Sequence, residues 1–158
     1  MTRQILAGIV LGVGAALAPV HAQAPAQVVP VEVVAQLRDG PRVELRFIVK
    51  SNSDEPMRYF VDGLPWGVYG AAAIVVATPT GETLDPEAPI EDPGPAIAVL
   101  QPRQEVRGSI DLTARFPSLK KRRRETDLLV FWSYEFWRTM PEGEAKRAGG
   151  WLLLPRSR

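Results

Sequence analysis

The residues that could carry out chemistry in this chain are few, because the sequence has no cysteine and a single histidine, His21. Serine hydrolases need an imidazole to move protons near neutral pH. Zinc sites rely mostly on imidazole and thiolate donors. His21 itself lies in an N-terminal segment that has the features of a cleavable signal peptide. The sequence therefore predicts a protein that is not an enzyme and that has no catalytic residues, no metal site and no cofactor.

Carboxylates are the remaining candidates for acid–base chemistry. A glycosidase needs two of them at a fixed separation, one of them desolvated enough to stay protonated. The prolines of residues 84–95 predict a surface loop, which provides neither rigidity nor burial. Calcium accepts oxygen ligands, but the spacing of an EF-hand is missing. We interpret the stretch as a solvated loop and leave calcium binding open as the alternative. Its carboxylates are Asp85, Glu87, Glu91 and Asp92.

Two other features are candidates for binding a partner. Trp66 and Tyr69 lie near a turn rich in glycine and proline, where exposed aromatic side chains can anchor an interface; the alternative is that they pack in the core. A run of five basic residues is expected to be a solvated loop between two strands. Nucleic acid or anionic lipid headgroups could neutralise its charge, and a docking patch for an acidic partner is the favoured functional use. No aromatic residue interleaves the run to stack bases, so we expect no nucleic acid partner. The run comprises Lys120, Lys121, Arg122, Arg123 and Arg124.

The elements that position these residues are predicted to be strands. Short segments with apolar and polar residues in alternation are separated by turn signals, and no sustained helical periodicity appears. This pattern predicts an all-β fold, an immunoglobulin-like antiparallel β-sandwich of about seven to eight strands. We expect Trp132, Tyr134 and Phe136 to share the core face of one strand. A loop is expected at residues 141–150, with a possible helical turn at 142–147. The expected strands are residues 31–37, 43–50, 57–61, 72–77, 96–100, 106–112, 127–137 and 151–154.

The N-terminus predicts export. Arg3 provides a positive charge, residues 5–18 are mostly apolar, and residues 20–22 form a small-x-small cleavage site. This order is typical of a secretory signal peptide, and the apolar run is short for a membrane span; an uncleaved anchor is the alternative. We expect a signal peptide at 1–22, a flexible leader at 23–30 and one β-sandwich domain at 31–156. The mature protein would be periplasmic or extracellular, with no stable membrane span.

The order of turns and strands also resembles a known domain. Residues 52–56 lead into a strand and then into Gly-Leu-Pro-Trp at 63–66, followed by Leu-Gln-Pro-Arg-Gln at 100–104 and the aromatic strand at 131–136. This order is similar to the non-catalytic β-sandwich domain that precedes the catalytic domain of bacterial deuterolysin-type (peptidyl-Lys) zinc metalloproteases. It resembles the bacterial intracellular proteinase inhibitor family more distantly. The His-Glu-x-x-His motif of those proteases is absent, so the resemblance implies a partner-binding role without catalysis.

Three functions are compatible with these observations. The first is an exported protein-binding module, with Trp66, Tyr69 and the basic run as contacts and a secreted protease as one candidate partner. The module would act as an accessory, chaperone or inhibitor domain. The second is a structural envelope protein without a dedicated ligand. The third is an enzyme that uses carboxylates alone. The sequence leaves the identity of the partner and the oligomeric state open.

Overall fold

The fold is an antiparallel β-sandwich, as the alternating sequence predicts. A computed structural model describes residues 31–68, 71–87, 94, 96–136 and 146–157. The predicted signal peptide and leader lie outside these residues. None of the helices in the described ranges has the length and hydropathy needed to cross a bilayer. The described strands are β1 (Val31–Arg38), β2 (Glu44–Ser51), β3 (Met57–Phe60), β4 (Ala72–Ala77), β5 (Ile97–Leu100), β6 (Glu105–Asp111), β7 (Leu128–Phe136) and β8 (Lys146–Leu154).

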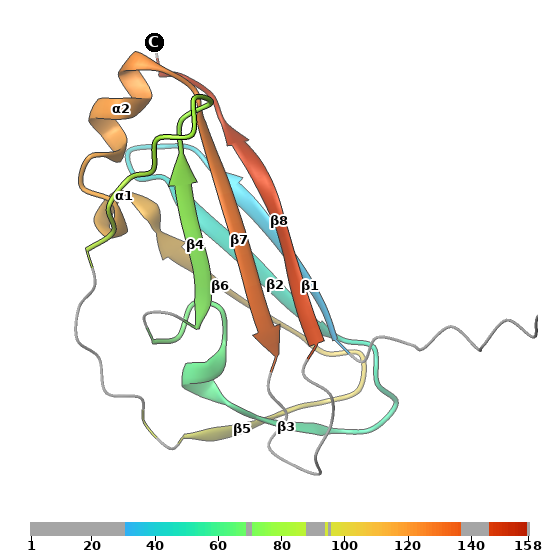
Figure 1. Ribbon diagram of the computed structural model, residues 1–158. Coiled ribbons are helices and arrows are strands. Elements are labelled where there is room, and N and C mark those ends of the chain that lie inside the picture. Colours follow the sequence, from blue (N-terminus) through green and yellow to red (C-terminus); the bar gives the residue numbers. More distant parts are fainter. Residues whose placement is uncertain (1–30, 69–70, 88–93, 95, 137–145, 158) are drawn as a thin grey trace, which may run out of the picture.

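Two three-stranded sheets form the layers of the sandwich. One sheet has the order β1-β2-β6 and the other β4-β7-β8, while β3 and β5 pair as a separate two-stranded ribbon. Figure 1 shows β4-β7-β8 in front of the other sheet and the β3–β5 ribbon at the lower end. The six strands of the two sheets can be lettered A, B, C, E, F and G in chain order, leaving out the ribbon strands β3 and β5. The sheets then have the A-B-E and C-F-G strand orders of a constant-type immunoglobulin domain. The predicted immunoglobulin-like sandwich is confirmed at the level of strand order and layers.

The core lies between the two sheets and is built by alternation along each strand. In β2, Leu45, Phe47 and Val49 are fully buried, because every second side chain of a strand points to the same face. Phe47 meets Trp132 of β7 edge to face, with ring centroids 5.5 Å apart. Trp132 is buried together with Tyr134 and Phe136, so the prediction that these three aromatic residues belong to the core is confirmed.

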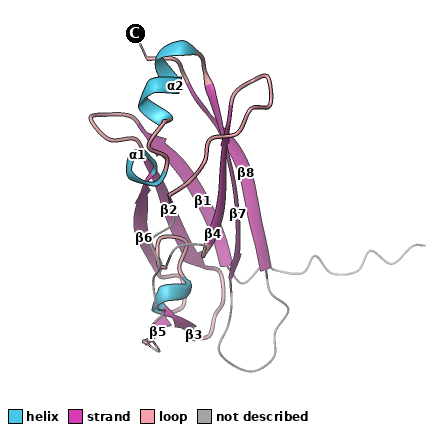
Figure 2. Cartoon of the chain, turned by 60° about the vertical axis from the view of Figure 1, so that its left-hand side comes forward, coloured by secondary structure: helices cyan, strands magenta, loops and turns pink. Residues whose placement is uncertain are grey.

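Two short helices close one end of the sandwich, where the sequence predicted only a loop. They are α1 (Leu112–Arg115) and α2 (Leu119–Glu125), and both are visible at the upper end of Figure 2. The Asp111 carboxylate caps α1 by accepting hydrogen bonds from the amides of Thr113 and Ala114 at 2.8 and 3.0 Å. Leu112, Phe116 and Leu119 are buried beneath the two helices. The loop interpretation of the basic run was therefore wrong, since the run forms α2.

The last strand is longer than the sequence indicated. β8 begins at Lys146, so the expected loop at 141–150 is wrong for its second half, and the helical turn expected at 142–147 has its last two residues in a strand. Residues 142–145 lie outside the described ranges. Gly149 and Gly150 do not form a turn here, because they pair with Ser133 and Trp132 of β7. A Cβ on Gly149 would lie 3.0 Å from the Trp132 carbonyl oxygen, which marks a close approach of two strands.

Candidate functional site

Trp66, the first predicted contact residue, packs on the sandwich instead of projecting from it. Its side chain is half-buried and lies against the core. The indole lies directly over Gly108 of β6, at the place where a Cβ on that residue would be. Glycine is therefore required at 108 for the ring to approach the strand so closely. A role for Trp66 in partner binding stays a prediction, and only part of its ring is open to a partner.

The other predicted contact near this turn, Tyr69, lies outside the described residues. Of the carboxylates in the proline-rich stretch, Asp85 and Glu87 are exposed, while Glu91 and Asp92 lie outside the described ranges. No group of three or more acidic or histidine side chains that could hold a metal ion occurs among the residues that the structure describes. The solvated-loop interpretation of the first two carboxylates agrees with their exposure.

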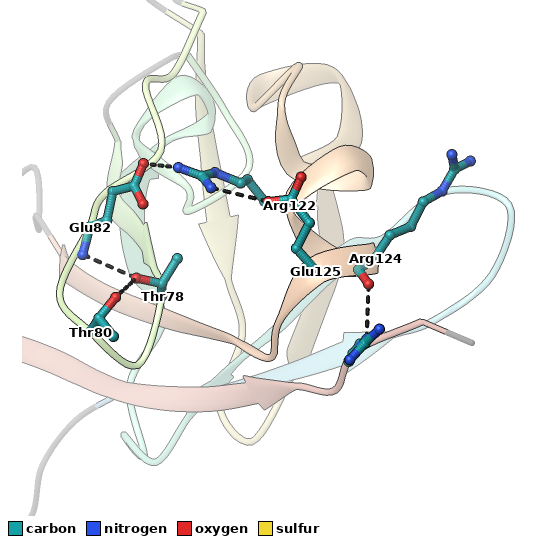
Figure 3. Close-up of polar contacts among 7 residues, drawn as sticks. Thr78, Thr80, Glu82, Arg122, Arg124 and Glu125 are labelled. Atoms are coloured by element: carbon teal, nitrogen blue, oxygen red, sulfur yellow. Dashed lines mark hydrogen bonds and ion pairs between the residues drawn. The ribbon is translucent and has the colours of Figure 1, made fainter.

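The predicted basic run divides into two residues that hold α2 in place and three that point outward. Arg122 forms ion pairs with Glu82, in the turn after β4, and with Glu125 one turn along the helix. Arg123 forms a two-pronged hydrogen-bonded pair with Asp39, in the turn between β1 and β2. These arginines tie the helix to both sheets. Figure 3 shows the contacts of Arg122 and the turn that supplies Glu82.

The pair between Arg123 and Asp39 affects the titration of both groups. The hydrogen bond from Arg123 lowers the pKa of the Asp39 carboxyl, and the same hydrogen bond raises the pKa of the guanidinium. Each ion thus favours the charged form of the other. Elsewhere, burial raises the pKa of the Tyr134 hydroxyl, which donates a hydrogen bond to the carbonyl of Gly63 at 2.8 Å.

The segment after β8 completes the attachment of α2. Arg123 donates from Nε to the Pro155 carbonyl at 2.7 Å, and the amide of Ser157 donates to the Arg123 carbonyl at 3.0 Å. Nε of Arg156 donates to the carbonyl of Arg124 at 2.9 Å, a contact drawn in Figure 3. The Ser157 amide and the Arg156 guanidinium therefore satisfy carbonyls at the end of the helix that would otherwise lack partners.

The outward side of α2 carries the remaining basic side chains. Lys120 and Lys121 are exposed, and Arg124 lies on the same side because it follows them by four and three residues. Figure 3 shows the side chain of Arg124 directed away from the ion pairs of Arg122. The Arg156 side chain is also exposed, with its Nε bonded to the backbone carbonyl of Arg124. These four residues are called the basic face below.

A surface that the sequence analysis missed is a row of apolar side chains on the outer face of the β4-β7-β8 sheet. Val75, Phe131 and Trp151 are direct neighbours across the three strands, since Val75 pairs with Phe131 and Phe131 with Trp151. Leu153 follows Trp151 on the same face of β8. Their exposed fractions are 47%, 42%, 63% and 51% respectively. This apolar stripe (Val75, Phe131, Trp151, Leu153) is a contiguous apolar surface of the kind that marks an interaction site.

A signal for the stripe was present in the sequence. Residues 128–131 are apolar on both faces of their strand, and residues 151–154 form an unbroken apolar run. The first pattern is expected of a central strand, and β7 is the central strand of its sheet. In a two-layer sandwich, however, each sheet packs on only one face, so apolar side chains on the second face are exposed unless a helix covers them. Here α1 and α2 lie at the end of the sandwich (Figures 1 and 2).

A smaller apolar group lies on the β3–β5 ribbon, at the opposite end from α2 (Figure 1). Phe60 pairs with Ile97, and Val99 follows two residues further along β5. All three side chains are exposed. They are fewer and less aromatic than the stripe residues, and Arg58 faces Val99 across the ribbon.

Comparison with known proteins adds no relative: no protein-family model matches the chain, and no curated protein matches it. The geometry therefore carries the functional argument alone. The described residues offer two surfaces, an apolar stripe on a sheet and a basic face on a helix. Both can bind a partner without bond-making chemistry.

Proposed function

We propose that this chain is an exported, non-catalytic protein-binding module that docks on its partner through the apolar stripe. The observation that supports this most directly is the register of Val75, Phe131 and Trp151, which places three large apolar side chains side by side on an uncovered sheet face. Large exposed apolar patches on folded domains are typical of interaction sites. The N-terminal sequence supports export, because it has the order of a signal peptide.

The composition of the stripe is that of an interface centre with a polar rim. Trp151 is the most exposed of its residues, and tryptophan is among the residues that most often dominate binding energy. Glu135 and Arg147 form an ion pair of 3.6 Å between β7 and β8, further along the same sheet. A charged pair beside an apolar centre is the usual arrangement in transient interfaces.

A secreted protease is the candidate that the resemblance to the accessory domain of deuterolysin-type enzymes implies, and the module would then fold, accompany or restrain it. The predicted contacts Trp66 and Tyr69 are secondary in this proposal, since Trp66 is partly occupied with packing on Gly108. A structural envelope role without a dedicated ligand is the alternative.

The test uses photo-crosslinking from the stripe. A photoreactive phenylalanine analogue replaces Trp151 in the full chain, and crosslinked proteins from the native envelope and culture fractions are identified by mass spectrometry. The matched control carries the same analogue at Phe60, which is also exposed and apolar but lies on the ribbon. We expect one partner to crosslink from position 151 and not from position 60. The same mass spectrometry should show that the exported chain begins near residue 23, as cleavage of a signal peptide predicts.

Affinity measurements with stripe variants then test whether the partner docks on the stripe. With the captured partner, Trp151→Ser should weaken binding by about 2 kcal/mol or more, the range of interface hot spots, and Phe60→Ser should leave it unchanged. Equal capture from both positions, or capture of general envelope components alone, would contradict docking through the stripe and favour the structural role.

A further inference from the structure

We propose that the basic face of α2 and the C-terminal segment binds the surface of a bilayer that contains anionic phospholipids. The surface consists of Lys120, Lys121, Arg124 and Arg156. It goes beyond the proposed protein-binding function and does not depend on it, because the basic face belongs to α2 and the segment after β8 whereas the stripe lies on the outer face of β4-β7-β8.

Three of these side chains, Lys120, Lys121 and Arg124, make no hydrogen bond or ion pair in the described part of the protein. The fourth, Arg156, donates from Nε to the Arg124 carbonyl and, among the described residues, keeps the rest of its exposed guanidinium free for a ligand. Neither lysine forms an ion pair there, and the Arg124 guanidinium has no acidic partner there either. The nearby acids of the fold are engaged elsewhere: Glu82 and Glu125 by Arg122, and Asp39 by Arg123. Asp127 accepts a hydrogen bond from the backbone amide of Arg156 at 2.7 Å.

The two lysines of the basic face lie where they destabilise helix α2. Lys120 and Lys121 occupy its first turn, since α2 begins at Leu119. The N-terminal end of a helix carries a partial positive charge and favours acidic side chains. Arg124 adds a like charge three and four residues later, and such pairs destabilise a helix slightly. Arg124 itself lies in the last turn, where a cation is favourable. The two lysines, however, lower the stability of the helix slightly and hold nothing together, which indicates a role outside the fold.

The shape of the surface around α2 also favours a bilayer as the ligand. Helix α2 caps one end of the sandwich in both views (Figures 1 and 2), so a planar surface can approach it without meeting the faces of the sheets. The charges stand on the convex side of a helix. An acidic peptide binds most readily along a groove or a sheet edge, whereas a bilayer presents a broad field of charge to any protruding cluster. Groups of four or more basic residues near an anionic leaflet are typical of lipid-surface binding.

The test is co-sedimentation of the full mature chain with vesicles of phosphatidylcholine and phosphatidylglycerol at a ratio of about 70:30. Each basic residue near such a surface contributes about fivefold to the partition coefficient. The variant Lys120→Gln, Lys121→Gln, Arg124→Gln should therefore bind on the order of a hundredfold more weakly. Binding should disappear on pure phosphatidylcholine and fall steeply at high salt, because ions screen exposed charges.

A matched control removes the same charge elsewhere. Arg46, Lys50 and Arg58 are exposed on strands β2 and β3, and their replacement by glutamine should leave vesicle binding within a few fold of the wild type. Trp151→Ser should bind vesicles like the wild type, which separates this proposal from docking through the stripe. Far-UV circular dichroism confirms that each variant is folded.

Three results would overturn the proposal. The first is equal binding to neutral and anionic vesicles. The second is equal loss in the triple variant and in its matched control. The third is tighter binding of soluble polyglutamate than of anionic vesicles under the same salt conditions, which would assign the basic face to an acidic protein instead.

Discussion

Gly108 lies beneath the indole of Trp66, and its replacement by alanine tests whether packing holds that ring in place. A Cβ at position 108 would overlap with Cγ, Cδ2 and Cε2 of the indole, so the ring would have to leave β6. Forcing a methyl group into a packed contact costs about 1–3 kcal/mol. In a strand, alanine is otherwise more stable than glycine by about 0.5–1 kcal/mol. The penalty should therefore depend on the presence of the ring.

The prediction is a coupling energy. Gly108→Ala should lower the free energy of unfolding by about 1 kcal/mol or more in the wild type and raise it slightly in a Trp66→Ala background. The coupling between the two sites should then be about 1.5–3 kcal/mol, within the range measured for residues in contact. Urea denaturation followed by far-UV circular dichroism gives all four corners of the cycle.

Gly40→Ala serves as the control, because a Cβ there meets nothing closer than the Arg42 carbonyl oxygen at 3.6 Å. It should change the unfolding free energy little in either background. Gly108→Ala could instead destabilise the protein equally with and without Trp66. Packing against Gly108 would then not hold the indole in place, and the whole Trp66 ring would be available to contact a partner.

Three further perturbations test the helix attachment and the core. Lys120→Glu should raise the unfolding free energy by about 0.3–1 kcal/mol, because an acid suits the first turn of α2, and should weaken vesicle binding; thermal denaturation and co-sedimentation measure the two effects. Arg123 lowers the pKa of Asp39 below its ordinary value of 3.8. The ion pair of these two residues therefore stabilises the fold above pH 3.8, and this stabilisation is lost as the pH falls through the lower pKa that Asp39 has in the folded protein. Asp39→Asn should cost at most about 1 kcal/mol at pH 7, and the difference between wild type and variant should shrink as the pH falls below 3.8 in urea titrations; a difference that does not change with pH would contradict this. Phe47→Ala removes the edge-to-face partner of Trp132 and should cost about 3–5 kcal/mol, seen as a large drop in the urea midpoint, whereas an unchanged midpoint would place the pair outside the core.

The strands were predictable because their signals are local. Residues 43–50 alternate between apolar and polar side chains after Asp39-Gly40, and β2 occupies nearly the same range. Helices α1 and α2 were not predictable, since they span only four and seven residues. Helices this short are marginal on their own, and the burial of Leu112 and Leu119 in the open end of the sandwich stabilises them.

The surfaces were less predictable than the strands, because they depend on pairing between distant segments. The charge of the basic run is visible in the sequence, but its division into inward and outward residues is not. Arg122 meets Glu82 across 40 residues of chain and Arg123 meets Asp39 across 84. The apolar stripe likewise needs the register that places Val75 and Trp151 on either side of Phe131.

The Phe47–Trp132 contact has a consequence for how the domain responds to its surroundings. It joins β2 to β7, the strand pair that carries the inter-sheet disulfide in antibody domains. An aromatic pair has no oxidised and reduced forms, and the chain has no cysteine elsewhere. The stability of the sandwich should therefore be independent of redox potential. We expect the domain to fold equally well with and without a thiol oxidase, including in a reducing host.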